Sequence, residues 1–274
     1  MRPPGASPAP GANDDGAIAI VVLTHNRVHL LRKCVENVLA STSTRTREIV
    51  IWNNGSGDGT RDYLDSLSDP RLRIVHSETN VGMNAYARAF AMTSAEFLVE
   101  LDDDVVDAPP EWDAVLLDAY RRLPTIGYLS ADLRDDPHDS ATHHRYRVYE
   151  YTEEELNGVR LLHGPVGGVC SITSRELNDR VGGFRQRPGR IFWLEDAAYV
   201  EAIGRLGYGA AILAELKVHH TGGDHYGAGS PLKDAYWAAE RKRRARRTAI
   251  KKLAFRVPFF RRLNARFGWR SEPT

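Results

Sequence analysis

Three consecutive aspartates, Asp102, Asp103 and Asp104, follow an apolar run that is typical of a buried strand. Two unit charges about 4 Å apart repel each other by roughly 4 kcal/mol near a protein surface, so crowded carboxylates require a counterion. Side chains alternate between the faces of a strand, which predicts that Asp102 and Asp104 project together while Asp103 points the other way. Such a pair can hold one Mg²⁺ with waters and substrate phosphates. The alternative is a solvated acidic loop after an edge strand.

The elements that would position these aspartates alternate between strand and helix. Four apolar runs, "AIAIVVLTH", "EIVIWNN", "RLRIVHS" and "EFLVEL", predict strands, and segments of helical periodicity separate them. This order predicts a doubly wound, mostly parallel α/β sheet. Ligands of such sheets bind at the carboxyl ends of the strands, where Thr24, Asn53 and Asp102 fall. Neither GxGxxG nor a Walker lysine motif occurs, so classical dinucleotide and P-loop sites are not supported.

The second half of the chain is less regular. The pattern predicts a helix near 111–123 and a strand at 126–133, and then a polar, His-rich loop or short hairpin at 134–151. A glycine-kinked strand follows at 163–174. Glu195 and Asp196 open an amphipathic helix, where the helix dipole favours negative charge. A last strand ends in His219 and His220.

Composition restricts the class of protein. The 274 residues suit one large α/β domain or two small ones. Cys34 and Cys170 lie far apart in sequence, which argues against a disulfide framework or a cysteine metal site and fits a reducing cytoplasm. No apolar run reaches the roughly 18 residues needed to span a bilayer. Residues 1–16 are rich in Pro, Gly and Ala and lack the apolar core of a secretion signal, which predicts a disordered leader.

The net charge of +1 conceals a strong asymmetry. Residues 232–274 contain 14 Lys or Arg and three acids, a net charge of +11, so the rest of the chain carries about −10. A basic tail therefore follows a mildly acidic body.

Seven short motifs occur in one order between Ile18 and Gly223: "VVLTHNR", "NNGSGDGT", "NVGMNAYAR", "LDDD", "GGV", "WLED" and "HHTGG". As an ordered set they resemble the inverting family 2 glycosyltransferases of GT-A fold. The resemblance implies a nucleotide-sugar donor, a divalent metal (Mg²⁺ or Mn²⁺) at the DxD motif, and a displacement assisted by a carboxylate base. It implies a GT-A domain at 17–228, with a nucleotide-sugar-binding half at 17–108 and an acceptor-binding half at 109–228, before a basic amphipathic helical tail at 229–274.

The resemblance also implies roles for individual residues. Asp196, the second residue of the "ED" pair, matches the general base, and Trp193 matches the family's sugar-stacking aromatic. The implied metal ligands are Asp104, Asp102 and His220, with His219 as the alternate histidine. The implied donor-binding residues are Thr24, Asn26, Arg27, Asn53, Asn80, Gly82, Asp102 and Asp103, and the implied acceptor-binding residues are Trp193, Glu195, Gly167 and Gly168.

One position departs from the family pattern. Where the family usually has an aspartate that accepts the ring N–H of the nucleobase, this sequence has Asn53. A neutral amide oxygen can accept that bond but discriminates less than a charged acceptor. The sequence favours a uracil or thymine donor, that is a UDP or TDP sugar, without excluding guanine.

The basic tail predicts a helix that lies in an anionic membrane surface, because apolar residues recur at intervals of three or four among many Lys and Arg. This predicts a peripheral position on the inner face of a membrane and a lipid-linked or cell-envelope acceptor. The alternative is that the aromatic residues pack back onto the catalytic domain. The tail shows no nucleic-acid reading motif, so we expect no nucleic-acid partner. The apolar residues in question are Leu253, Val257, Phe260, Leu263 and Phe267, followed by Trp269.

Two other functions share parts of this pattern. A sugar nucleotidylyltransferase has the same alternating architecture and metal aspartates, but the stretch "VVLTHNRVHL" is not the glycine-rich, basic loop that would bind its triphosphate. A non-catalytic nucleotide-sugar-binding domain would not need the base position, which is intact here. Both stay open as alternatives to a hexosyl-transferring enzyme.

Overall fold

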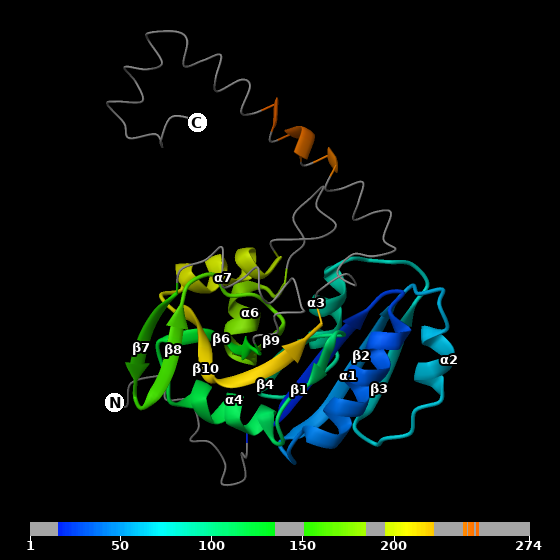
Figure 1. The fold of residues 1–274 in the computed structure, drawn as a ribbon, viewed down its shortest axis with the longest axis horizontal. Coiled ribbons are helices and arrows are strands. Elements are labelled where there is room, and N and C mark those ends of the chain that lie inside the picture. Colours follow the sequence, from blue (N-terminus) through cyan, green and yellow to red (C-terminus); the bar gives the residue numbers. More distant parts are fainter. Residues whose placement is uncertain are drawn as a thin grey trace, which may run out of the picture. The chain divides into compact units, whose positions relative to one another are not determined.

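The computed structural model describes residues 16–134, 151–184 and 195–221, and the short pieces 238–239, 241–243 and 245–246. The chain divides into two compact units, 1–223 and 224–274. Nearly all of the predicted leader, most of the predicted tail and the predicted boundary at 228/229 lie outside the described residues. The described pieces of the tail are helical (Figure 1). Among the described residues, none of the helices is long and apolar enough to cross a membrane.

The first half of the chain alternates strands and helices as predicted. The central strand β1 is apolar and buried on both faces, with its first four residues fully buried, whereas the edge strand β3 is only partly buried. Strand β1 pairs in parallel with β2 and β4, and β2 pairs in parallel with β3. The elements are β1 (Ile18–Thr24), α1 (Val28–Ser41), β2 (Thr46–Asn54), α2 (Thr60–Asp65), β3 (Leu72–Ser77), α3 (Asn84–Ala91) and β4 (Phe97–Asp102).

The second half contains elements that the sequence pattern did not predict. These are the short strand β5, the hairpin of β7 and β8, and helix α6. Strand β7 is exposed and acidic, so it shows no apolar alternation. Helix α6 has only seven residues, too few to show a clear helical periodicity. The elements are β5 (Val105–Asp107), α4 (Trp112–Arg121), β6 (Ile126–Leu133), β7 (Thr152–Leu156), β8 (Val159–His163), β9 (Cys170–Ser174), α6 (Arg175–Val181), α7 (Glu195–Arg205) and β10 (Gly209–His220).

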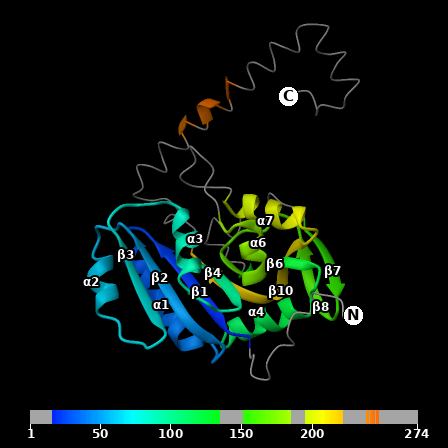
Figure 2. The same ribbon diagram turned by 180° about the vertical axis from the view of Figure 1, so that it is seen from behind.

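One sheet runs through the whole first unit, in the order β3-β2-β1-β4-β9-β6-β10-β8-β7. Strand β9 is antiparallel to both β4 and β6, whereas β6 and β10 are parallel. Helices cover both faces of this sheet (Figures 1 and 2). Ile18, Ile20 and Val22 of β1 belong to the core cluster that α1, α2 and α4 cover, and Ala19 and Val21 belong to the cluster under α3 and α7. The predicted doubly wound α/β arrangement is therefore present.

The sheet brings the carboxyl ends of β1, β2 and β4 to one edge. Their last residues are Thr24, Asn54 and Asp102. Strand β10 reaches the same edge from the other half of the sheet, because its end pairs with β5, directly after the aspartates, and places His220 opposite Val105. The fold thus gathers loops from both halves of the chain.

At the opposite edge, the buried carboxylate of Asp113 holds the start of α4 against the segment before β2. It accepts hydrogen bonds from the Ser43 N–H and hydroxyl, both at 2.8 Å, and from the Thr46 hydroxyl at 2.6 Å. Asp113 is fully buried, so removing its oxygens would leave these donors without partners.

We predict that Asp113→Ala lowers the free energy of unfolding by about 3 kcal/mol, because buried donors lose a charged acceptor. Urea denaturation would measure this loss. The matched control is Asp118→Ala on the same helix, whose side chain is 60% exposed, and it should change stability by less than about 0.5 kcal/mol. Equal losses in the two variants would contradict the prediction.

Candidate active site

The loops after β1 and β2 are locked together. Asn26 has a φ of 54°, and its side-chain oxygen accepts the Gly57 N–H at 2.7 Å. The Asn26 N–H donates to the Ser56 hydroxyl at 3.0 Å, and the Asp58 carboxylate accepts the Val28 N–H at 2.9 Å, at the start of α1. Asn26, predicted to bind donor, therefore shapes the loop that carries Arg27. The sequence analysis did not single out Asp58.

Asn53 is buried at the end of β2, and its amide has a fixed orientation. Its side-chain oxygen accepts the Ser56 N–H at 3.0 Å, so its amino group faces Nδ1 of His76 at 3.1 Å. This makes Nδ1 an acceptor and leaves Nε2 of His76 to donate to Asp65 at 3.0 Å. The oxygen that the sequence analysis assigned to a nucleobase already accepts one hydrogen bond inside the protein.

The neighbouring Asn54 holds the loop before α3. Its side-chain oxygen accepts the Val81 N–H at 2.8 Å, and its amino group donates to the Asn80 side-chain oxygen at 2.9 Å. The same Asn80 oxygen accepts the Gly82 N–H at 2.8 Å, and Gly82 has a φ of 62°. Two predicted donor-binding positions, Asn80 and Gly82, thus form a tight turn that the unpredicted Asn54 anchors.

The aspartates do not all belong to a strand. Strand β4 ends at Asp102, and Asp103 and Asp104 lie in a turn, so the alternation argument was wrong for Asp104. Arg27 spans the two buried carboxylates: its Nη1 lies 2.6 Å from Asp103, and its Nη2 pairs with Asp104. Arg27 and Asp103, both predicted to bind donor, are therefore partners in an ion pair. Thr24 is buried beside them at the end of β1.

Asp102, Asp104 and His220 come together at the edge of the sheet. One ligand atom from each lies within 4.8 Å of the others, and Nε2 of His220 is 3.0 Å from Asp104 and 3.6 Å from Asp102. In the described part of the chain, neither Oδ1 of Asp104 nor the His220 ring nitrogens have a well-directed hydrogen bond. Two carboxylates and an imidazole are suitable ligands for Mn²⁺ or Mg²⁺. His219, the alternate, is not part of this cluster.

Burial and neighbouring charges shift the ionisation of this group. Burial alone would lower the pKa of His220, but Asp104 and Asp102 outweigh it and raise this pKa to about 10. Burial opposes ionisation of Asp104, yet His220 and Arg27 hold its pKa below the ordinary value. Burial raises the pKa of Asp103 to about 7 despite the adjacent Arg27. Without a metal, Asp104 and His220 therefore form a charged pair near neutral pH.

Asp196 is joined to the end of β4 through two adjacent residues, Gly168 and Val169. Its carboxylate accepts the Gly168 N–H at 3.0 Å, and the carbonyl of Val169, the next residue, accepts the Asp102 N–H at 2.9 Å. Gly167 lies alongside, with its Cβ position 3.9 Å from the Asp196 carboxylate. The structure thus brings Asp196, Gly167 and Gly168 close to the end of β4, where Asp102 lies. Trp193 and the side chain of Glu195 lie outside what the structure describes.

A buried acid that the sequence analysis did not predict, Glu100, lies against Gly168. Glu100 is 2% exposed and accepts a hydrogen bond from the Tyr128 hydroxyl at 2.9 Å. A Cβ on Gly168 would stand 2.5 Å from the Glu100 carboxylate, so only glycine fits there without displacement. The "GGV" motif thus has a packing reason. Sequence analysis missed Glu100 because β4 is otherwise apolar up to Asp102, and a single acid within a buried strand gives no sign of its partner.

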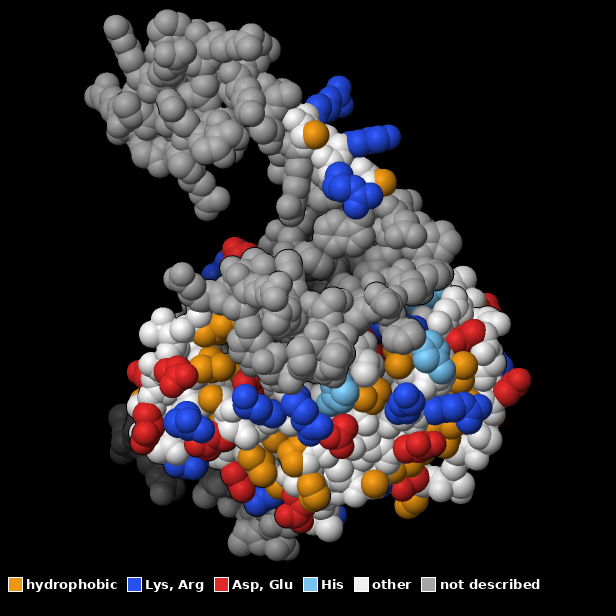
Figure 3. Space-filling model, in the orientation of Figure 1, with side chains coloured by type: hydrophobic (Ala, Val, Ile, Leu, Met, Phe, Trp, Pro, Cys, Tyr) orange, Lys and Arg blue, Asp and Glu red, His pale blue; other side chains and the backbone are white. Residues whose placement is uncertain are grey.

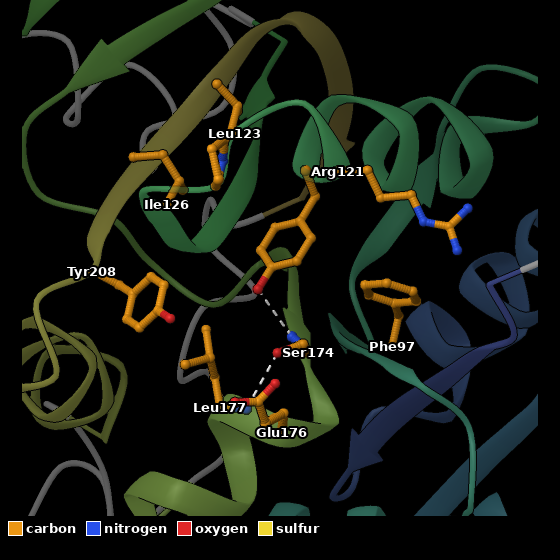
Figure 4. Close-up of a pocket in the computed structure, with 10 residues that line it drawn as sticks. Phe97, Arg121, Leu123, Ile126, Ser174, Glu176, Leu177 and Tyr208 are labelled. Carbon is orange, nitrogen blue, oxygen red and sulfur yellow. Dashed lines mark hydrogen bonds between the residues drawn. The ribbon is translucent and has the colours of Figure 1, made fainter. Parts of the chain in front are cut away.

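A separate pocket lies at the other end of the sheet (Figure 4). Its lining includes Phe97 at the start of β4, Ile126 at the start of β6, and Tyr208. The Tyr120 hydroxyl accepts the Ser174 N–H there at 3.2 Å. Phe97 and Asp102 are the two ends of one strand, roughly 16 Å apart. This pocket is therefore not part of the acidic site.

The fold is of the GT-A type, and comparison of the sequence identifies the family. The sequence model for "Glycosyl transferase family 2" matches residues 19–182, which is more than half of the chain. The chain therefore belongs to glycosyl transferase family 2, as the order of its motifs indicated.

Two curated relatives are distant. An uncharacterised protein, y4gI, from Sinorhizobium fredii is 24% identical over 189 residues, which cover 62% of this chain and 20% of the relative. The putative colanic acid biosynthesis glycosyl transferase WcaA of Escherichia coli is 26% identical over 121 residues, which cover 42% of each protein. The chain thus aligns with less than half the length of either relative.

Two solved structures share the fold. The mannosyltransferase PcManGT from Pyrobaculum calidifontis, in complex with GDP-Man and Mn²⁺, has a TM-score of 0.54 at 21% identity, over 76% of this chain and 58% of that one. The glucosyl-3-phosphoglycerate synthase of Mycobacterium tuberculosis, in complex with Mn²⁺, UDP and glucosyl-3-phosphoglycerate, has a TM-score of 0.53 at 18% identity, over 81% and 75% of the two chains. These likenesses establish the GT-A fold.

The Asp104–His220 pair should make the stability of the metal-free protein depend on pH. The pKa of His220 is raised from 6.5 to about 10, so its stabilising effect is complete below pH 6.5 and is lost as pH rises toward 10. In EDTA, we predict that His220→Asn lowers stability by about 2 kcal/mol at pH 6.5, or roughly 5 °C in melting temperature. Calorimetry across this range should show the difference from wild type shrinking toward pH 10. A difference independent of pH would contradict the ion pair.

Proposed function

We propose that this chain is an inverting, divalent-metal-dependent glycosyltransferase that moves a hexosyl group from a nucleoside diphosphate sugar to a hydroxyl acceptor. The observation that carries the proposal is the two-residue segment Gly168–Val169, whose Gly168 N–H binds the Asp196 carboxylate and whose Val169 carbonyl binds the Asp102 backbone N–H. It holds a carboxylate that can accept a proton beside a group that can bind a metal. Displacing a nucleoside diphosphate from a sugar requires both of these groups.

The leaving group needs charge stabilisation. A metal bound by Asp102, Asp104 and His220 would supply a positive charge for the departing diphosphate. The chain contributes two carboxylates and one imidazole that the fold already holds within 4.8 Å of one another. Because Asp104 and His220 are buried, little rearrangement is needed to fix their direction, and this preorganisation favours transition-state charge.

Asp196 fits the role of general base. It lies in the first turn of α7, and the Gly168 N–H fixes one of its oxygens. In the proposed step the acceptor hydroxyl oxygen bonds to the anomeric carbon while the bond from that carbon to the diphosphate oxygen breaks, and the hydroxyl proton passes to Asp196. Attack from the face opposite the leaving group inverts the anomeric configuration.

The nucleobase is a finer part of the proposal. Asn53 favours a uracil or thymine base, since its amide oxygen keeps one lone pair beyond the bond from Ser56. The two structural neighbours are described with GDP-Man and with UDP, so they support a nucleotide-sugar donor without choosing between bases. A thermal-shift panel of UDP, TDP and GDP sugars with Mn²⁺ would rank them.

The central test separates metal binding from proton abstraction. With the donor that binds best, we expect Mn²⁺-dependent diphosphate release, lost in EDTA and in Asp104→Asn. Asp196→Asn should still bind the nucleotide sugar but lose about 10²- to 10⁴-fold in rate, because it cannot accept the proton. Glu201→Gln, an exposed substitution on the same helix, is the matched control and should keep full activity.

Four outcomes would contradict this assignment. Activity of Asp196→Asn within a few-fold of wild type would remove Asp196 as the base. A product that retains the donor's anomeric configuration, measured by proton NMR, would exclude the inverting mechanism. Donor binding without any diphosphate release would favour the non-catalytic binding domain, and release of pyrophosphate from a nucleoside triphosphate would favour the nucleotidylyltransferase.

We also propose that the tail docks on an anionic membrane and that the acceptor is lipid-linked or part of a cell-envelope glycan. The described part of the tail supports a basic helix, because its Lys and Arg side chains are all exposed (Figure 3). On the face of the first unit seen in Figure 3, by contrast, acidic and basic side chains are interspersed. Basic residues near an anionic surface each contribute about 1 kcal/mol to binding. The described tail residues of this kind are Arg241, Lys242, Arg243 and Arg246.

Sedimentation with vesicles tests the tail. The full chain should sediment with vesicles that contain phosphatidylserine and stay in the supernatant with pure phosphatidylcholine. Removing residues 232–274 should release the protein, and changing the four described basic residues to Gln should weaken binding, more so in high salt. Equal recovery of the full and shortened chains in the supernatant would rule out membrane docking and favour a tail that packs on the enzyme.

A further inference from the structure

Asp104 lies between two positively charged side chains of the protein itself. Arg27 contacts one oxygen of its carboxylate, and Nε2 of His220 lies 3.0 Å from the other. The Asp104 side chain is only 1% exposed, so water does little to screen these contacts. Arg27 also holds Asp103 at 2.6 Å. The Asp104 carboxylate, which a metal would use as a ligand, is therefore already paired with the Arg27 guanidinium.

The position of Arg27 is set by its loop. The Arg27 carbonyl accepts the N–H groups of Leu30 and Leu31 in the first turn of α1. On either side, Asn26 is bonded to Gly57 and Ser56, and the Val28 N–H is bonded to Asp58. The Arg27 side chain is 25% exposed, so it reaches from a fixed backbone into the buried site. It cannot leave the aspartates without breaking two ion pairs.

Charge counting shows what this arrangement does to a metal ion. Asp103 and Asp104 share the guanidinium of Arg27, and Asp102 and Asp104 lie within 3.6 Å of His220. A divalent ion that binds Asp104 cannot remove the charge of the Arg27 guanidinium, which stays protonated in proteins. The ion therefore binds beside a fixed positive charge. The phosphates of a nucleotide would add negative charge there and offset that repulsion.

We propose that Arg27 is a fixed counter-cation that makes divalent-metal binding depend on the nucleoside diphosphate, so that metal and donor occupy the site together. The inference rests on the proposed function, because it assumes that a nucleoside diphosphate binds beside Asp102 and Asp104. Arg27 acts here as a positioning residue, through Asp103 and Asp104. By linkage, the metal and the nucleotide must strengthen each other's binding by the same factor.

The coupling is measured without turnover, from the electron paramagnetic resonance signal of free Mn²⁺. In the wild-type full chain, we expect UDP or GDP to raise Mn²⁺ affinity by at least about tenfold, a coupling of roughly 1.4 kcal/mol. Arg27→Met keeps the aliphatic volume but removes the charge, so it should bind Mn²⁺ alone about tenfold more tightly and show a smaller nucleotide effect. Arg27→Lys keeps the charge and should retain most of the coupling.

Arg45→Met is the matched control. Arg45 has a side chain of similar exposure, 31%, and its carbonyl accepts the Ile18 N–H at the other end of β1. It loses the same charge far from the aspartates, so its Mn²⁺ binding should equal that of wild type. Circular dichroism and thermal melting would show that each variant is folded.

Two results would overturn the inference. The first is a wild-type protein that binds Mn²⁺ equally well with and without nucleotide, which requires no variant at all. The second is a folded Arg27→Met whose nucleotide-free Mn²⁺ affinity is the same as, or weaker than, that of wild type. If diphosphate release proceeds while either result holds, only the role of Arg27 fails. If no nucleotide binds, with or without Mn²⁺, the proposed function itself fails.

Discussion

The need to neutralise buried negative charge governs the arrangement at the carboxyl edge of this sheet. Asp103 and Asp104 are nearly inaccessible to water, and an isolated buried carboxylate would take up a proton instead of staying charged. Arg27 from the first loop and His220 from the last strand prevent this for Asp104. Residues separated by almost two hundred positions must therefore meet at one point, which requires the whole sheet to be complete.

The loops around this point are held by side-chain amides and backbone groups instead of by apolar packing. Asn26 and Asn54 each accept a backbone N–H of a neighbouring loop, and Asn53 accepts one from the loop that follows it. Polar loops of this kind keep a defined shape while their outer faces stay available to a ligand. Below the loops, the apolar clusters on the two faces of the sheet form a rigid base. The polar groups thus lie at the edge of the sheet, and the apolar packing lies below them.

The order of strands and helices in the first half could be predicted because each buried strand is a continuous apolar run. The hairpin of β7 and β8 could not, because β7 is the acidic sequence "TEEEL" at an exposed edge. The family resemblance gave His220 as a metal ligand with His219 as the alternate, and the structure places His220 in the acidic cluster. Roles of long polar side chains were harder to predict. Arg27 contacts a partner 76 residues away in sequence and Asp58 contacts one 30 residues away, and no local pattern shows such a partner.

The segment Gly168–Val169 limits which substitutions the site can accept. The Gly168 N–H holds the Asp196 carboxylate and the Val169 carbonyl holds the Asp102 backbone N–H, so two residues of chain, about 7 Å at full extension, separate the two attachment points. Glu100 closes the space underneath, which prevents a larger residue from shifting one group alone. Substitutions should therefore be tolerated far better in the surrounding loops than in this two-residue segment, which acts as a spacer of fixed length.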